Sequence, residues 1–152
     1  MNKTFGCVRK ACNLMLEDKI KRYEETKEML HATPAMDEEQ YPYLKEVDSL
    51  ALANAQLNLK AACINFFQRP EVGFPDFKRK HRDRDSYTAN CANNNISLAG
   101  QYIAHPKAGR VRIKKHRGAP DHYKLKSCTA GQESSEKHFT SVLMDIAGLS
   151  SR

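Results

Sequence analysis

Apolar residues recur at three- and four-residue steps along the first part of the chain, with charged residues between them. Over residues 2–28 they are Phe5, Val8, Cys12, Met15 or Leu16, Ile20 and Tyr23. This spacing puts them on one face of an α-helix, and the stretch EDKIKRYEETKE (17–28) is typical of its solvated end. The pattern breaks at Pro34 and Pro42, so we expect a connection there with at most one turn of helix.

A second helical pattern begins at Asp48 or Ser49, since the side-chain oxygen of either residue can accept the unpaired amide hydrogens of a helix N-terminus. The stretch SLALANAQLNLKAACINFF (49–67) follows. Its larger apolar residues fall at heptad steps, with Ala53 and Ala61 as small fillers: Leu50, Leu57, Ile64 and Phe67. We predict that this stripe is core and that two antiparallel helices pack through such stripes. Residues 1–68 would then form one helical unit.

The pattern becomes alternating after Arg69–Pro70. RVRIKK (110–115) predicts a half-buried strand with a basic outer face, because Val111 and Ile113 fall on the side opposite Arg110, Arg112 and Lys114. Further short strands are indicated at 96–98, 122–127 and 138–144, with turn-rich sequence between the last two. We therefore predict an α+β fold, in which residues 69–152 form a small β-unit.

Composition narrows the class of protein. The five cysteines are Cys7, Cys12, Cys63, Cys91 and Cys128. They form no C-x-x-C pair, which indicates buried or incidental thiols and neither a disulfide framework nor a zinc ribbon. No run approaches the roughly 18 apolar residues of a membrane span, and the first residues lack a signal-peptide pattern. We expect a soluble cytoplasmic protein with no metal and no cofactor.

Positive charge is concentrated in the middle of the chain. Residues 69–126 hold fourteen Lys/Arg against five Asp/Glu, whereas residues 1–68 hold nine against ten. Such a block attracts polyanions, because each neutralised phosphate releases condensed counterions. A solvated basic surface kept for solubility is the alternative, but concentration in one block favours nucleic acid.

The densest charge lies in VGFPDFKRKHRDRDSY (72–87), and we call its five cations the basic segment: Lys78, Arg79, Lys80, Arg82 and Arg84. These side chains can hold phosphates. Phe74 and Phe77 either stack on bases or pack in the core, and packing is favoured because the β-unit is short of aromatic residues. Tyr87 is open to both roles. The asparagines 93–95 predict a turn, with base recognition as the alternative.

No Gly-rich phosphate loop, G-x-S-x-G or H-E-x-x-H motif is present, and no sequence cue pairs carboxylates for metal-dependent cleavage. The chain does resemble one family. KEVDSLALANAQLNLKAACINFF (45–67), VGFPDFKRK (72–80) and SYTANCANNNISL (86–98) are similar, in order, to the N-terminal half of OrfB/TnpB proteins, the transposon-encoded RNA-guided nucleases. NKTFGCVRKACNLMLEDKIKRYEE (2–25) is similar to their first helix, and HPKAGRVRIKKH (105–116) to a later strand.

The resemblance implies a helical recognition unit inserted in a wedge-type β-barrel, which together hold a guide RNA from the transposon end and read target DNA. Ser49, Ala53 and Asn93 correspond to the surface that reads the target motif, and the basic segment to the surface that holds the nucleic-acid backbone. The family's first strand has no counterpart here, so we expect an incomplete barrel. The RuvC-like domain, with its catalytic carboxylates and zinc site, also has no counterpart, so we expect no enzyme activity.

The resulting hypothesis is an RNA- and DNA-binding fragment of a transposase. Its candidate contacts are Lys78, Arg79, Lys80, Arg82, Arg84, Tyr87, Asn93, Ser49, Arg110, Arg112 and Lys114. Two other interpretations remain open. The chain is either a decayed remnant that folds poorly, favoured by the sequence drift at 108–110, or an interaction module that pairs with a full-length family member.

Overall fold

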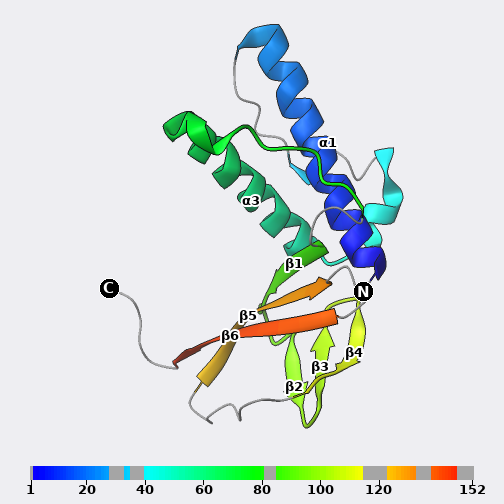
Figure 1. Ribbon diagram of the computed structural model, residues 1–152. Coiled ribbons are helices and arrows are strands. Elements are labelled where there is room, and N and C mark those ends of the chain that lie inside the picture. The colour runs from blue at the N-terminus through cyan, green and yellow to red at the C-terminus, as the bar shows by residue number, and fades with distance from the viewer. Residues whose placement is uncertain are drawn as a thin grey trace.

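The computed structural model describes residues 2–27, 33–34, 40–80, 85–114, 123–132 and 138–146. Two long helices, α1 (Asn2–Thr26) and α3 (Ser49–Gln68), lie on one side of two small antiparallel sheets (Figure 1). Short 3₁₀ turns, η1 (Pro42–Glu46) and η2 (Pro70–Val72), come before and after α3. The α+β prediction is confirmed, and the two sheets do not close into a barrel.

Each sheet has three strands. One has the order β1-β5-β6, from β1 (Asp85–Asn90), β5 (Tyr123–Gln132) and β6 (His138–Ile146). The other has the order β2-β3-β4, from β2 (Ser97–Ala99), β3 (Tyr102–His105) and β4 (Gly109–Arg112). Sequence reasoning missed β1 and β3, and it assigned residues 129–132 to a turn. These four residues continue β5, where β1 pairs with one edge and β6 with the other, so the ladder overrides a turn-like composition.

The helices are parallel, and the antiparallel prediction is wrong. Both begin beside the sheets and run away from them in the same general direction (Figure 1). Near their starts Phe5 of α1 packs on Tyr87, and near their ends the rings of Tyr23 and Phe67 lie 6.4 Å apart. Leu44 in η1 belongs to the core beside the helix starts, so the chain has returned there before α3 begins.

The α1 stripe is confirmed at its first positions, since Phe5, Val8, Cys12, Met15 and Leu16 are all buried. The helix ends at Thr26, whose hydroxyl donates to the Arg22 carbonyl. The next residue, Lys27, takes the left-handed conformation that commonly terminates a helix.

The prediction that the heptad stripe of α3 is its core face is wrong. Leu57, Ile64 and Phe67 are 59%, 44% and 50% exposed. The core face of α3 instead consists of Ala51, Leu52, Ala55, Leu59 and Cys63. The two buried alanines allow α3 to lie close to its neighbours, so the helix turns its larger heptad residues outward. Asp48 occupies the N-cap as predicted, but its side chain makes no capping hydrogen bond.

The apolar interior has two parts. The larger joins both helices to the first sheet through Tyr87 and Ala130. The smaller lies between the sheets and contains Ala89, Ile96, Ile103 and Cys128. The prediction that the cysteines are thiols is confirmed, because all five are unpaired and four are buried. The division into domains at residues 1–68 and 69–152 stays a prediction.

Candidate nucleic-acid interface

The described part of the basic segment, residues 78–80, is fastened to α1. After η2 the chain turns at Gly73, where φ is +82°, and it then runs extended across α1 (Figure 1). Asn13 of α1 holds it at two points: its Nδ2 donates to the Lys78 carbonyl at 2.9 Å, and its Oδ1 accepts from the Lys78 amide at 2.8 Å. The side chains of Lys78, Arg79 and Lys80 are exposed. Arg82 and Arg84 lie outside the described residues.

The aromatic residues before this segment are only partly covered. Phe74 and Phe77 are 40% and 45% exposed, so the prediction that they pack inside is wrong. Phe74 meets Phe66 edge to face, with ring centroids 5.3 Å apart. Because this contact is at the surface, it directs the chain away from the end of α3 without building a core.

A second tie joins α1 to β1 next to the basic segment. Arg9 Nη1 donates to both carboxylate oxygens of Asp85, at 2.7 and 2.9 Å, and the two side chains are 18% and 22% exposed. Asp85 is therefore neutralised by an internal partner and does not oppose an approaching polyanion.

A separate group of cations consists of Arg110 and Arg112 in β4 and Lys114 just after it; we call these three the β4 cations. All three side chains are exposed, while Val111 and Ile113 between them are half-buried against the smaller core. The predicted alternation is therefore confirmed. Arg112 Nη2 donates to Gln101 Oε1 at 3.3 Å. An open pocket of about 510 Å³ is lined by Gln101, Arg112, Ile113 and Lys114.

The remaining predicted contacts lie elsewhere on the surface. Ser49 is the exposed first residue of α3. Asn93 is exposed in the turn after β1 and has a φ of +52°. Asn95 holds this turn, since its Oδ1 accepts from the Ala92 amide at 2.8 Å and its Nδ2 donates to the Asn90 carbonyl at 3.2 Å. The prediction of a turn at 93–95 is confirmed, and base recognition by Asn93 stays a prediction.

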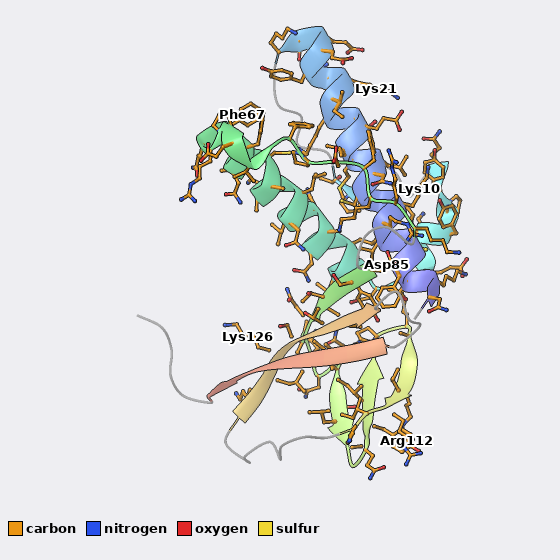
Figure 2. All side chains as sticks on the ribbon, viewed as in Figure 1. Lys10, Lys21, Phe67, Asp85, Arg112 and Lys126 are labelled. Carbon is orange, nitrogen blue, oxygen red and sulfur yellow. The ribbon has the colours of Figure 1, made fainter. Side chains whose placement is uncertain are left out.

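The structure does not gather all these residues into one patch. Figure 2 shows Arg112 of β4 at the sheet end of the molecule, and Lys10, on the helix that carries the basic segment, well apart from it among the helices. The cations at residues 78–80 and the β4 cations therefore lie at two separate places on the surface. This arrangement suits an extended polyanion better than a small anion.

The prediction that Tyr87 contacts nucleic acid is wrong. Its ring is 5% exposed, lies edge-on to Phe5 with centroids 5.3 Å apart, and is 6.0 Å from the His105 ring. Burial raises the pKa of Tyr87 to about 12. A ring enclosed in this way cannot stack on a base, so packing is its role.

A buried polar pair, His105 and Cys128, lies near Tyr87 where the two sheets meet. His105 is 3% exposed, and its Nε2 lies 3.5 Å from the Sγ of Cys128. Burial lowers the pKa of His105, and it raises the pKa of Cys128 to about 12. Reactive cysteines lie in partly exposed sites, whereas Cys128 is 0% exposed, so this pair is part of the core.

Sequence reasoning missed Tyr102, which is 44% exposed and has the Arg110 guanidinium 5.5 Å from its ring centroid. The alternation of YIAH (102–105) carries the signal, but four residues are too few to stand out without the strands beside them.

Within the described ranges, no group of three or more His, Cys, Asp or Glu side chains is placed to hold a metal ion. The described helices also include none with the length and apolar character to span a membrane.

Comparison with known proteins adds one finding. Residues 1–28 match the family model of the helix-turn-helix domain of OrfB proteins of the IS605 group. This range corresponds to α1, the helix to which the basic segment is fastened. The match supports a DNA-binding function associated with transposition. No curated protein matches the chain.

Proposed function

We propose that the chain binds DNA and RNA as the nucleic-acid-holding part of an OrfB/TnpB-type system. The observation that carries the proposal is the position of the basic segment. Its exposed side chains at residues 78–80 project from a backbone that Asn13 fixes on α1, the helix that matches a DNA-binding domain.

The geometry suits phosphate binding for a physical reason. A cation on a loose loop loses conformational entropy when it binds, and that loss reduces the affinity gained. Here the backbone of Lys78 is already held at its amide and its carbonyl, so this part of the backbone needs no further ordering on binding. Asp85, the acidic residue at the start of β1, is paired with Arg9.

The resemblance to OrfB/TnpB sequences supports the finer part of the proposal. The RNA partner is a guide-type RNA from the transposon end, the DNA partner is its target, and both are met in the cytoplasm. The residues assigned here hold phosphates and bases, and the proposal includes no cleavage step.

The test is affinity for a duplex DNA and an RNA of the same sequence, measured by fluorescence anisotropy at 50 and 200 mM salt. If about six phosphates are contacted, affinity falls roughly a thousandfold over this range. Changing Lys78, Arg79 and Lys80 together to Ala is expected to reduce the slope of log K against log salt by about one unit per lost contact.

A matched control removes the same charge from scattered exposed positions, with Lys45, Lys60 and Lys124 changed to Ala. It should lower affinity less and leave the slope nearer to that of the unchanged protein. Equal effects of the two triple variants would mean that only net charge matters, and no binding at either salt concentration would refute the proposal.

A protein-interaction role is the second candidate, because α3 exposes Leu57, Ile64 and Phe67 on one side. Sedimentation velocity distinguishes it from nucleic-acid binding. Self-association that is insensitive to salt, and that is lost when Leu57 and Phe67 are changed to Ser, would favour this candidate.

A further inference from the structure

The sheet β2-β3-β4 has one face in the core and one face outside. Leu98 pairs with Ile103, and Ile103 with Val111, and these residues belong to the smaller core. Neighbouring positions along each strand point the opposite way. The residues of the other face are Ser97, Ala99, Tyr102, Ala104, Arg110 and Arg112; we call this the outer face.

The register places the outer-face residues in a defined pattern. Tyr102 in the central strand is directly opposite Arg112 on one side and Ala99 on the other, while Ala104 is opposite Arg110 and Ser97. All six are exposed except Ala104, which is half-buried. One aromatic ring therefore stands among small side chains, with two guanidinium groups along the β4 edge.

Small neighbours matter because a flat ring needs room beside it before another ring can lie on it. Ser97, Ala99 and Ala104 have no bulk to block such an approach. The Arg110 guanidinium lies over one face of the Tyr102 ring, 5.5 Å from its centroid, so a stacked base has to use the opposite face. Gln101 Oε1 accepts a hydrogen bond of 3.3 Å from Arg112. The pocket of about 510 Å³ is lined by Gln101, Arg112, Ile113 and Lys114, so there is open space next to two of the cations.

We propose that the outer face binds single-stranded nucleic acid, with Tyr102 stacked on one base and the β4 cations on the flanking phosphates. This inference rests on the proposed nucleic-acid binding and specifies where unpaired bases are held.

A single strand fits this face better than a duplex. Bases in a duplex are stacked on one another, so a protein ring has no free base face to meet. An aromatic side chain on an open sheet, with cations along its edge, is a recurring arrangement for unpaired bases. The face also suits a protein partner poorly, because Tyr102 is its one large apolar side chain.

The composition of the chain provides a direct test, because it contains no tryptophan. The change Tyr102→Trp places a single indole at the proposed stacking position, and a stacked base quenches indole fluorescence. The matched control is Tyr43→Trp, since Tyr43 in η1 is 39% exposed against 44% for Tyr102. Oligo(dT) should quench the first variant and leave the second nearly unchanged, and heparin, a polyanion without bases, should quench neither.

Affinity measurements on the full chain supply an independent readout. Tyr102→Ala should weaken binding of oligo(dT) by about five- to a hundredfold, while Tyr102→Phe, which keeps the ring, should stay within about twofold. The salt slope should not change in Tyr102→Ala, because no charge is lost. In Arg112→Ala it should fall by about 0.7 for one phosphate contact on a single strand.

The outcomes separate this inference from the function on which it rests. If duplex and RNA binding still depend on residues 78–80, but the indole of the Tyr102→Trp variant is not quenched and Tyr102→Ala binds normally, the outer face is not a stacking site and the proposed function stands. If the chain binds none of these nucleic acids, both fall. Equal quenching by heparin and oligo(dT) would show that the indole senses charge, and it would also overturn the stacking proposal.

Discussion

The heptad residues of α3 face outward. We therefore predict that truncation to alanine destabilises the protein far more at Leu52 than at Leu57, five positions further along the helix. Leu52 is 1% exposed and Leu57 is 59% exposed. Truncating a buried leucine to alanine removes its burial energy and leaves a cavity, at a cost of about 2–5 kcal/mol. At Leu57 no cavity can form and most of the side chain is already in water, so the cost should be about 0.5 kcal/mol or less. The higher helix propensity of alanine offsets part of even that.

The assay is equilibrium unfolding in urea with the slope m compared between variants, since an unchanged m means that the midpoint shift reports stability. Leu52→Ala should lower the free energy of unfolding by at least about 1.5 kcal/mol more than Leu57→Ala. Should Leu52→Ala fail to fold, Leu52→Met keeps the volume and should cost less than about 1.5 kcal/mol.

A second pair on the same helix guards against a local peculiarity. Leu59 is 4% exposed and Ile64 is 44% exposed, so Leu59→Ala should lower the free energy of unfolding more than Ile64→Ala. Equal losses in both pairs, or a larger loss at Leu57 and Ile64, would mean that the heptad stripe is the core and that the orientation of α3 described here is wrong.

Three further predictions concern the contacts between elements. A double-mutant cycle between Arg9 and Asp85, with each changed to Ala, should give a coupling energy of about 1–2 kcal/mol; a value near zero would mean that this ion pair does not stabilise the packing of α1 on β1. Burial lowers the pKa of His105, so the unfolded chain takes up this proton at higher pH than the folded chain. The stabilisation from burying neutral His105 is therefore complete above about pH 6.5 and is lost as the pH falls below that value. The urea midpoint should drop between pH 7.5 and 5.5, and an equal drop in His105→Gln would contradict this assignment. Finally, a thiol reagent should label half-buried Cys91 in the native protein before Cys128, which is 0% exposed with a pKa of about 12, and a Cys91→Ser variant should lack the fast phase.

Much of the secondary structure follows from local sequence. The α1 stripe, the start of α3 beside Asp48 and the in–out alternation of β4 are all confirmed, because each depends on a periodicity that the backbone imposes on every side chain. The turn at 93–95 also follows from local chemistry, since asparagine tolerates a positive φ and its side chain bonds to nearby backbone. The identity of the basic segment was evident from charge alone.

Which faces meet was decided by the tertiary structure. The α3 sequence offers two apolar faces, one with larger residues that include Leu57, and one of alanines with Leu52 and Leu59. Periodicity cannot choose between them. The face with small residues packs inside because it lets α3 lie close to the rest of the core.

The same reason explains the surprises at the candidate site. Tyr87 and Tyr102 look alike along the chain, yet strand pairing directs the first into the core and the second to the outer face beside Arg110 and Arg112. Asn13 and the basic segment are 65 positions apart, and no local pattern links them. Charge and residue type along the chain show which groups can meet a polyanion, and the long-range pairing of strands and helices sets where each of them lies.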